Sequence, residues 1–517
     1  MKRMLIIATV LIFACGSLLV QTDSGEADSF HKAVAESPAP GTIFFYPERI
    51  QLKDGGFFAA ERGMMFVPAN RSDEKGAVIG IEVYRFKSSG KAKPGTPPIF
   101  FLHGGPSFAG LERSLERLGT FEERWLPLLD VSDVVVVGQR GIGSSKPNTI
   151  IDINTNFPLD RAVTEEEAAA ALREACAKEK AFWEAQGVDL SGLTVIEAAA
   201  DVNDVRKALG YEKVIIWGGS FGSHWGMAVM RYYPEIVERA ILRGMEGPNH
   251  TYDHSGHLWN VYKNVAAEAG KAPELKGIIP EVGLIGAIET VVERIKKKPV
   301  KVTVTDPKTG KSQDVLFTAR EAGRLARGYS GGLPGWPANV ITLYHGNFSD
   351  AAKRAVRRQD SRRFSTASFY MLDHGSGITP EREAELKADP AVKILGDINS
   401  HYTITRDIWG SDLGDEFRQN FETNIPTVIV HGTWDTSTPY ENALELVPYF
   451  KNSKFIPVIR GPHGAIRAAM RASEQFRRGV MHFAATGDMS ELPDKVEMPP
   501  VDWIIPESAK KKENKKG

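Results

Sequence analysis

The sequence predicts an α/β fold with a mostly parallel sheet, interrupted by a large inserted cap. Continuous apolar runs at 98–102 and 133–137 are typical of strands buried on both faces of a parallel sheet. Helical patterns at 164–186 and 194–209 alternate with such runs, as in βαβ units. The stretch 246–424 then separates the early strands from the late ones, and it is too long to be a loop.

The expected elements follow in chain order. A strand meander comes first, because apolar residues alternate or cluster between Gly and Asp turns. Buried parallel strands and their connecting helices come next, and two further strands follow the insertion. A hairpin is expected inside the insertion, around Pro307 to Gly310. The expected strands are 42–46, 63–67, 78–86, 98–102, 133–137, 213–217, 239–242, 300–306, 313–317, 426–430 and 454–459, and a further helix is expected over 221–233.

The composition is that of a folded globular protein. The 517 residues include 42% hydrophobic and 25% charged residues, with 64 Lys and Arg against 65 Asp and Glu. This length exceeds the roughly 250–300 residues at which a single core stops growing, so a second large unit is expected. A net charge of −1 argues against a basic nucleic-acid-binding surface.

The first twenty residues have the pattern of an export signal. A basic start at Lys2 and Arg3 precedes an apolar run over 4–20. Residues 12–16 resemble a bacterial lipoprotein box, which would make Cys15 the lipidated residue. An ordinary cleaved signal and an uncleaved anchor are the alternatives. All three predict an exported protein, which is periplasmic, membrane-anchored or secreted. No later segment approaches a membrane span, so the chain beyond residue 20 is expected to be soluble, with a possible lipid at Cys15 as its membrane contact.

Domain boundaries follow from these patterns. Residues 1–20 are the predicted signal, and the polar segment 21–41 is a tether. The core then has two parts separated by a cap, which we expect at the carboxyl edge of the sheet, where open α/β sheets bind ligands. The predicted bounds are 42–245 for the first part of the core, 246–424 for the cap, 425–500 for the second part and 501–517 for a tail.

A candidate nucleophile follows the strand at 213–217. Residues 218–222 read Gly-Gly-Ser-Phe-Gly and precede a helical pattern, the strand-turn-helix context of a nucleophile elbow. The flanking glycines permit a sharp turn that leaves the Ser220 hydroxyl at the edge of the sheet. Without that context, a glycine-rich turn with an N-capping serine would be the simpler interpretation.

Two later strands supply the partners that a serine nucleophile needs. Asp435 follows the strand at 426–430, and His463 follows the strand at 454–459. A histidine base, oriented by a carboxylate, activates the hydroxyl. The order Ser220, Asp435, His463 is that of an α/β-hydrolase. Asp435 as a helix cap and His463 as a turn residue are the alternatives; weaker histidine candidates are His431, His482 and His224.

Backbone donors for an oxyanion are expected in the turn after the strand at 98–102. This turn reads His-Gly-Gly-Pro over 103–106. The N–H of Phe221, with that of Gly105 or Gly104, would form the hole, and we favour Gly105 slightly. A tight turn that needs glycine for its backbone conformation is compatible with the same role.

These motifs together resemble the prolyl aminopeptidase (proline iminopeptidase) family of α/β-hydrolases, especially its tripeptidyl-aminopeptidase-like branch. The resemblance spans about residues 42–480 and rests on 103–106, Gly-Gln-Arg-Gly at 138–141, 218–223 and the late Asp and His. It implies a serine exopeptidase acting on peptide N-termini, with a peptide as partner and no cofactor or metal. Ser107 and Gly138 depart from the family pattern, and Gly138 removes an acid expected to brace Arg140.

The resemblance also implies an acidic anchor for the substrate ammonium, for which Glu246 is the candidate. A structural partner for Arg243 or an alternate triad acid are the other interpretations of this residue. Histidines at 250, 254 and 257 have spacings that could bind zinc on a helix, but a pocket wall or plain surface is favoured. Cys176 lies in a helical stretch and is expected to be buried and inert.

The predicted function is therefore that of an exported serine hydrolase, with aminopeptidase activity on short peptides through an acyl-enzyme. A carboxylic ester hydrolase with the same three residues is the alternative. A non-catalytic binding protein on a retained hydrolase fold is the third. The oligomeric state is left open.

Overall fold

The computed structural model describes residues 38–106, 120–306, 309–328, 330–360 and 364–507. The predicted export signal with Cys15, most of the tether, Ser107 and the end of the tail lie outside the described residues.

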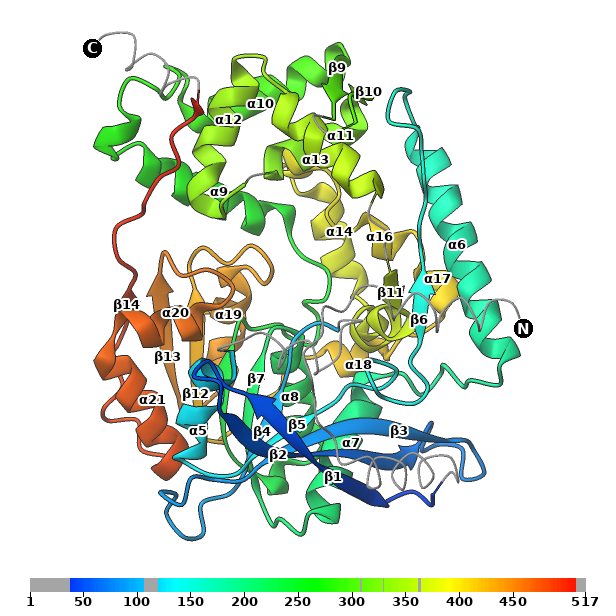
Figure 1. Ribbon diagram of the computed structural model, residues 1–517, viewed down its shortest axis with the longest axis vertical. Helices are drawn as coiled ribbons and strands as arrows, with labels where there is room; N and C mark the ends of the chain where they lie inside the picture. The colour runs from blue at the N-terminus through cyan, green and yellow to red at the C-terminus, as the bar shows by residue number, and fades with distance from the viewer. Residues whose placement is uncertain (1–37, 107–119, 307–308, 329, 361–363, 508–517) are drawn as a thin grey trace.

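Ten of the described strands form one twisted sheet in the lower half of Figure 1. Its order is β1-β2-β3-β5-β4-β7-β8-β12-β13-β14. The first three strands are an antiparallel meander, and β3 also runs antiparallel to β5, whereas all later neighbours are parallel. The strands are β1 (Ile43–Gln51), β2 (Phe57–Pro68), β3 (Val78–Phe86), β4 (Ile99–Leu102), β5 (Val134–Val137), β7 (Val214–Gly219), β8 (Val237–Arg243), β12 (Thr427–Gly432), β13 (Ser453–Ile459) and β14 (Val496–Glu497).

The central strands are buried because helices cover both faces of the sheet. All four residues of β4 and of β5 are buried, as their continuous apolar runs predict. One face packs against α7 (Val195–Ala208), α8 (Phe221–Tyr232) and α19 (Tyr440–Leu446). The other packs against α4 (Thr120–Arg124), α5 (Leu126–Leu129), α20 (Ala465–Ala472) and α21 (Glu474–Thr486).

The inserted segment forms a second, largely helical layer above the sheet in Figure 1, with its own apolar core. The expected hairpin is confirmed, because β9 pairs with β10 in antiparallel register. The elements are α9 (Ser255–Ala269), α10 (Gly283–Lys297), β9 (Val300–Thr305), β10 (Ser312–Phe317), α11 (Ala319–Arg327), α12 (Trp336–Tyr344), α13 (Ser349–Asp360), β11 (Phe364–Thr366), α14 (Pro380–Ala388), α15 (Val392–Leu395), α16 (Ser400–Thr403), α17 (Arg406–Trp409) and α18 (Gly414–Arg418). We refer to this layer as the cap.

A segment that precedes the insertion in sequence also contacts the cap. The short strand β6 (Ile150–Asp152) pairs with β11, and α6 (Glu165–Ala185) packs beside α17, as Figure 1 shows. Cys176 on α6 is buried in this contact, as expected, and burial raises the pKa of its thiol to about 11.

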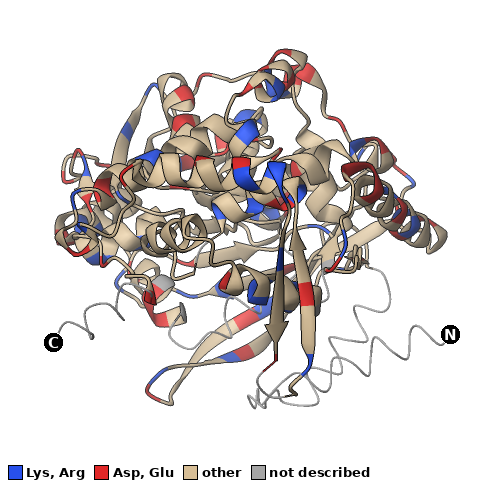
Figure 2. Cartoon of the chain, turned by 90° about the horizontal axis from the view of Figure 1, so that it is seen from above, with Lys and Arg blue, Asp and Glu red and all other residues tan. Residues whose placement is uncertain are grey.

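Lys and Arg are interspersed with Asp and Glu over the view in Figure 2, which accords with the near-zero net charge. Among the helices of the described residues, none combines the length and the apolar character that crossing a bilayer requires.

Candidate functional site

Ser220 lies at the sharp turn between β7 and α8. Its φ of 59° is in the left-handed region, which a side chain other than glycine rarely adopts. The turn is held by a hydrogen bond of 3.0 Å from the Ser220 N–H to the Arg243 carbonyl at the end of β8. Such local strain, fixed by neighbouring backbone, is typical of functional positions.

Close backbone contacts explain the glycines around this serine. A Cβ on Gly222 would lie 2.0 Å from the Leu102 carbonyl oxygen, so any larger residue would push α8 away from β4. A Cβ on Gly104 would lie 2.9 Å from the Ser220 Cβ and 3.5 Å from its Oγ. The His-Gly-Gly-Pro turn therefore faces the serine, as the sequence predicts.

Asp435 and His463 are in direct contact. His463 Nδ1 lies 2.9 Å from Oδ1 and 2.8 Å from Oδ2 of Asp435, whose side chain is fully buried. The N–H groups of Ser437 and Thr438 each donate to Asp435 Oδ1 at 2.9 Å. Burial alone would raise the pKa of Asp435, but the hydrogen bond and charge of His463, together with His431 and the Thr438 N–H, more than offset burial, so the pKa is lowered. Asp435 is thus a carboxylate that orients the imidazole.

The candidate serine, aspartate and histidine all follow strands of the parallel part of the sheet, within four neighbouring strands. Ser220, Asp435 and His463 follow β7, β12 and β13, which lie beside one another with only β8 between the first two. A Cβ on Gly244, the residue after β8, would lie 3.2 Å from His463 Cε1. Within the described part of the chain, no hydrogen bond joins Ser220 Oγ to His463, a contact that commonly tightens only when substrate binds.

The candidate oxyanion donors lie beside the serine. Gly105 has a φ of 127°, which glycine alone adopts readily. Among the described residues, the N–H groups of Gly104, Gly105 and Phe221 have no backbone acceptor. Their role as donors to an oxyanion, and the choice between Gly104 and Gly105, stay predictions.

The weaker histidine candidates have structural partners instead. His431 is fully buried and bonds through Nε2 to the Thr438 carbonyl at 2.8 Å, and it accepts the Met245 N–H at Nδ1. His224 lies on α8 and bonds to Ser376 Oγ at 2.8 Å, while burial lowers its pKa to about 4. His482 is at the surface, 3.2 Å from Asp488.

Glu246 lies close to the elbow, and it faces another carboxyl group rather than an arginine. Its N–H donates to Ser223 Oγ at 3.0 Å, and Ser223 in turn bonds to the Ser220 carbonyl. Its side chain is buried against Asp373 of the cap. Burial and the Asp373 charge raise the pKa of Glu246 well above its ordinary value, and burial also raises that of Asp373.

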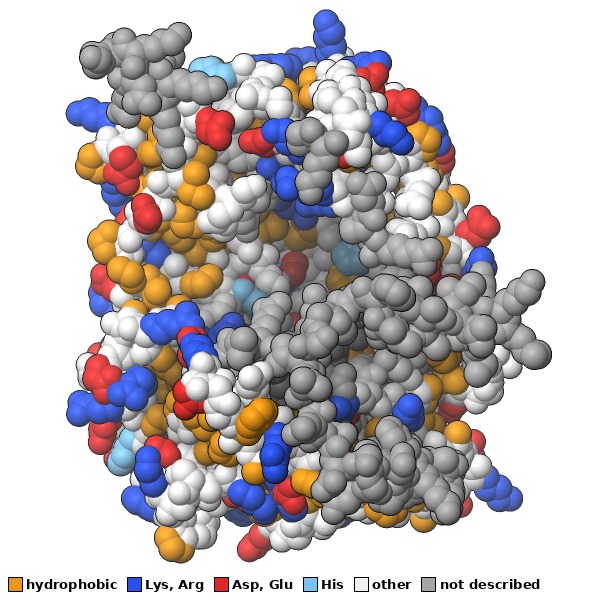
Figure 3. Space-filling view, in the orientation of Figure 1, with side chains coloured by type: hydrophobic (Ala, Val, Ile, Leu, Met, Phe, Trp, Pro, Cys, Tyr) orange, Lys and Arg blue, Asp and Glu red, His pale blue; other side chains and the backbone are white. Residues whose placement is uncertain are grey.

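No Lys or Arg of the described residues forms an ion pair with either carboxyl group. Asp373 approaches His374 at 3.7 Å, but burial holds the pKa of His374 well below its ordinary value, so that imidazole is neutral. Figure 3 shows a hollow between the cap and the sheet in which acidic and histidine side chains are visible. The interpretation of Glu246 as a partner of Arg243 is not supported, because the Arg243 guanidinium points toward the His463 carbonyl at 3.4 Å.

The sequence did not predict Asp373. Asp373 is the last residue of a π-helical turn, Phe369–Asp373, inside the cap. Such turns are frequent at functional sites. Asp373 follows no strand of the sheet and lies in no motif, so the sequence offered no pattern by which to predict it. The sequence also did not predict that Asp253 would lie near Glu246 and Asp373. Burial and the Glu246 charge raise the pKa of Asp253.

The three histidines at 250, 254 and 257 do not form a metal site with their neighbours. His250 Nε2 lies 2.9 Å from Glu445 Oε2, and the rings of His254 and His257 pack at 4.6 Å between centroids. Within the described ranges, no three His, Cys, Asp or Glu side chains are arranged as metal ligands.

Buried polar contacts follow the His-Gly-Gly-Pro turn, at Gln139 and Arg140. The Gln139 side chain donates to the His103 carbonyl at 3.0 Å. The next residue, Arg140, is fully buried and bonds to Asp201 through Nε at 2.5 Å and Nη2 at 2.6 Å. It also lies 3.1 Å from Glu197. The acid that the family pattern places before Gln139 is therefore replaced by acids on α7.

Removing this brace should destabilise the fold. Asp201→Asn leaves the Arg140 guanidinium buried without its main counter-charge, which costs about 3–5 kcal/mol in the free energy of unfolding. Asp204→Asn, one turn along α7, is the matched control. Arg71 pairs with both Asp201 and Asp204, so this variant removes one Arg71 contact but leaves Arg140 paired, and its loss costs about 0–1 kcal/mol. Urea denaturation measures both, and equal effects would contradict the assigned role of Asp201.

Comparison with known proteins agrees with this geometry. Residues 97–264 match the family described as alpha/beta hydrolase fold. The chain contains an α/β-hydrolase domain. Ser220, the His-Gly-Gly-Pro turn and Glu246 all lie inside the matched region.

Three curated relatives are similar to this chain over part of its length. A proline iminopeptidase of Neisseria meningitidis is 28% identical over 164 residues, covering 32% of this chain and 37% of that protein. A tripeptidyl aminopeptidase of Streptomyces coelicolor is 26% identical over 210 residues, covering 40% and 38%. The serine protease Hip1 of Mycobacterium bovis is 29% identical over 196 residues, covering 36% of each chain. The matched stretches thus span less than two-fifths of these relatives.

Proposed function

We propose that this α/β-hydrolase is a serine aminopeptidase that releases residues from the N-terminus of short peptides through an acyl-enzyme. The arrangement of Ser220, Asp435 and His463 supports a hydrolase mechanism. The names of the relatives, a proline iminopeptidase and a tripeptidyl aminopeptidase, support peptides as the substrate class.

In the proposed mechanism, Ser220 Oγ attacks the carbonyl carbon of the scissile peptide bond while His463 accepts the hydroxyl proton. The carbonyl oxygen becomes an oxyanion, held by the N–H groups of Phe221 and of Gly105 or Gly104. His463 then protonates the leaving amine as the C–N bond breaks. Water attacks the acyl-enzyme with His463 again as the base, the bond from the acyl carbon to Ser220 Oγ breaks, and His463 returns the proton to Ser220 Oγ. Asp435 stabilises the imidazolium formed in both steps.

The observation that carries the aminopeptidase proposal is the carboxyl pair of Glu246 and Asp373. Two buried carboxyl groups without a Lys or Arg partner are costly to fold, because burial disfavours their charged forms. A substrate ammonium is a cation that would pair with them. The Glu246 backbone N–H is linked through Ser223 Oγ to the Ser220 carbonyl, which supports the proposal that the pair binds the N-terminus of a peptide held at Ser220.

The test is to compare purified protein on peptides with free and with N-acetylated N-termini. We expect the free peptides to be cleaved and the acetylated ones to be poor substrates, because acetylation removes the positive charge. Equal cleavage of both would refute the amine anchor. Turnover of small acyl esters without peptide cleavage would favour the alternative, a carboxylic ester hydrolase with the same three residues.

A non-catalytic role makes a different prediction. A fluorophosphonate probe reacts only with an activated serine, so the wild-type protein should be labelled and the Ser220→Ala variant should not. Labelling is read on a gel after incubation with the probe. Absence of labelling in folded wild-type protein would refute both enzyme proposals.

We also propose that the protein is exported and that Cys15 is lipidated. The support is the sequence pattern of residues 1–20. Cys15→Ser should shift the mature protein from the membrane fraction to the soluble fraction when an otherwise full-length chain is expressed in a bacterium. Incorporation of labelled fatty acid measures the modification directly, and unchanged fractionation together with absent labelling would refute it.

A further inference from the structure

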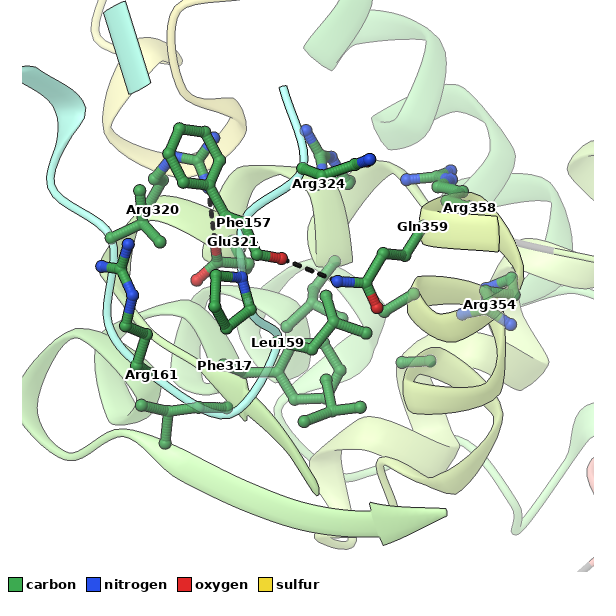
Figure 4. A pocket seen from close by; sticks show the side chains of 18 of the residues that line it. Phe157, Leu159, Arg161, Phe317, Arg320, Glu321, Arg324, Arg354, Arg358 and Gln359 are labelled. Carbon is green, nitrogen blue, oxygen red and sulfur yellow. Dashed lines mark hydrogen bonds and ion pairs between the residues drawn. The ribbon is translucent and has the colours of Figure 1, made fainter. Parts of the chain in front are cut away.

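A cavity of about 160 Å³ lies in the cap, where the segment 154–163 covers α11 and α13, as Figure 4 shows. Two of its arginines have acidic partners, since Arg161 pairs with Glu167 and Arg320 pairs with Glu321. A smaller cavity of about 40 Å³ lies beside the sheet, on the face that α20 and α21 cover. The last residue of β8 lines this smaller cavity and connects it to the candidate site.

This residue, Arg243, contacts the turn that carries the candidate nucleophile. Its strand lies between β7 and β12, and its backbone carbonyl accepts the Ser220 N–H at 3.0 Å. Its side chain crosses Gly219, where a Cβ would lie 2.5 Å from the Arg243 Cζ and 2.6 Å from its Nε. The backbone of Gly219 is not in the left-handed region, so glycine is needed there for space rather than for conformation. A methyl group at this position would therefore displace the guanidinium.

The same side chain contacts the loop that carries the candidate base. Arg243 Nη1 donates to the His463 carbonyl at 3.4 Å. Among the described residues, no backbone N–H donates to this carbonyl, so the guanidinium is its donor in the structure. A Cβ on the next residue, Gly244, would lie 3.2 Å from His463 Cε1 and 3.1 Å from Thr438 Oγ1. The end of β8 thus contacts the elbow on one side and the His463 loop on the other.

Within the described part of the chain, no acid forms an ion pair with Arg243. Glu123 lines the same cavity, but it pairs with Arg471. The charge of Asp435 favours the charged guanidinium, yet burial and the charge of Arg467 outweigh it and lower the pKa of Arg243 to about 10. The guanidinium is therefore charged at neutral pH, in a place where folding removes much of its hydration.

Most of the remaining lining of this cavity is apolar. Leu128 of α5, Trp217 of β7 and Ile466 of α20 are buried around it. An apolar side chain as long as that of arginine would fill the same place without the cost of a buried charge. Arg243 is therefore better explained by its contact with His463 than by the stability of the fold.

We propose that Arg243 is a positioning residue, which fixes the loop of His463 relative to the elbow of Ser220. Its side chain packs against Gly219 and holds the His463 carbonyl, so that the imidazole stays within reach of Ser220 Oγ during acylation and deacylation. The role rests on the proposed serine hydrolase mechanism, because Arg243 acts through His463. It does not depend on the ammonium anchor, so an activated ester is the appropriate substrate for its test.

The test is steady-state kinetics of Arg243→Met and Arg243→Lys on an activated ester, with scanning calorimetry of each variant. We expect Arg243→Met to lower kcat by about 10- to 100-fold, as misplacement of a catalytic group does. Lysine can donate to the same carbonyl but lacks the planar fork, so Arg243→Lys should recover part of this loss. The Tm of Arg243→Met should equal or exceed that of the wild type, since a buried charge is removed. Wild-type kcat in Arg243→Met, no recovery in Arg243→Lys, or a Tm of Arg243→Met below that of the wild type would each overturn the positioning role.

Two further variants test the contacts on either side of the guanidinium. Arg467→Met is the matched control, because Arg467 lines the same cavity, whereas the donor to the His463 carbonyl is Arg243, so this variant should keep the wild-type kcat. Gly219→Ala should lower kcat as Arg243→Met does, because the added methyl group displaces the Arg243 side chain. In the Arg243→Ala background, Gly219→Ala should cost nothing further. Additive losses, or an equal loss in Arg467→Met, would overturn the proposed coupling.

Fluorophosphonate labelling distinguishes failure of this role from failure of the proposed function. Labelled wild-type protein whose Arg243→Met variant keeps the wild-type kcat would overturn the positioning role and leave the serine hydrolase mechanism intact. Folded wild-type protein that is not labelled would overturn both, because there would be no activated serine for His463 to serve.

Discussion

Asp435→Asn is expected to lower kcat by about 10⁴-fold while leaving the fold intact. Asparagine fits the same space but presents an amide where the carboxylate now contacts His463 Nδ1 at 2.8 Å. The imidazole would then be held in the wrong tautomer, and the imidazolium formed during the reaction would lose its counter-charge. Steady-state kinetics on an activated ester and on a peptide measures the loss, and both substrates should lose activity equally.

Two control variants are needed to interpret the activity loss of Asp435→Asn. Ser220→Ala sets the level of activity without the nucleophile, and near-ultraviolet circular dichroism shows that each variant is folded. Glu246→Gln should retain ester turnover, because Glu246 lies against Asp373 rather than against His463. If Glu246→Gln abolished ester turnover and Asp435→Asn did not, Glu246 would be the orienting acid and the assignment made here would be wrong.

Glu246→Gln is expected to lower kcat/KM for peptides with a free N-terminus by about 10- to 100-fold, since a hydrogen bond to a charged group contributes about 1.5–3 kcal/mol. Activity on N-acetylated peptides and on esters should change little. Asp373→Asn should show the same selectivity, because both carboxyl groups face the same buried space. A uniform loss on all substrates would indicate a structural role and would contradict the anchor.

The pH dependence provides an independent readout of the same pair. The pKa of Glu246 is raised, so at acidic pH the pair is protonated and attracts no cation. The ratio of kcat/KM for free over acetylated peptides should therefore rise with pH until the substrate α-amine loses its own proton, at about pH 8, and pH effects on the chemical steps common to both substrates cancel in the ratio. In Glu246→Gln this rise should be reduced. A ratio independent of pH in the wild type would contradict the proposed anchor.

The free energy of unfolding should fall with rising pH, whereas the kcat/KM ratio should rise. A carboxyl group with a pKa raised by folding binds more protons in the folded state, so its contribution to the free energy of unfolding is present below the unfolded pKa of about 4.3 and is lost as pH rises through the folded pKa. Glu246→Gln removes this loss, and its Tm at pH 8 should exceed that of the wild type. Scanning calorimetry measures it, and a lower Tm would mean that the carboxylate stabilises the fold.

The sequence was informative where backbone geometry forces a residue choice. Gly222 cannot be larger because α8 packs onto the Leu102 carbonyl, and such a constraint leaves a local pattern that can be read without a structure. The buried runs of β4 and β5 mark a parallel sheet for a similar reason, since both faces are covered by helices. The acids around Arg140 were not predicted, because Asp201 and Glu197 reach it from α7 across more than fifty residues of chain.

The sequence by itself determined the α/β-hydrolase fold, the hairpin in the cap and the strand ends that carry Ser220, Asp435 and His463, because each depends on local periodicity and on turn chemistry. Only the tertiary structure decided which charges face one another. It placed Asp373 against Glu246 and the Arg243 guanidinium between Gly219 and the His463 carbonyl. Electrostatic interactions depend on distance and burial rather than on sequence separation, so residues far apart in the chain acquire a shared role only when the fold brings them together.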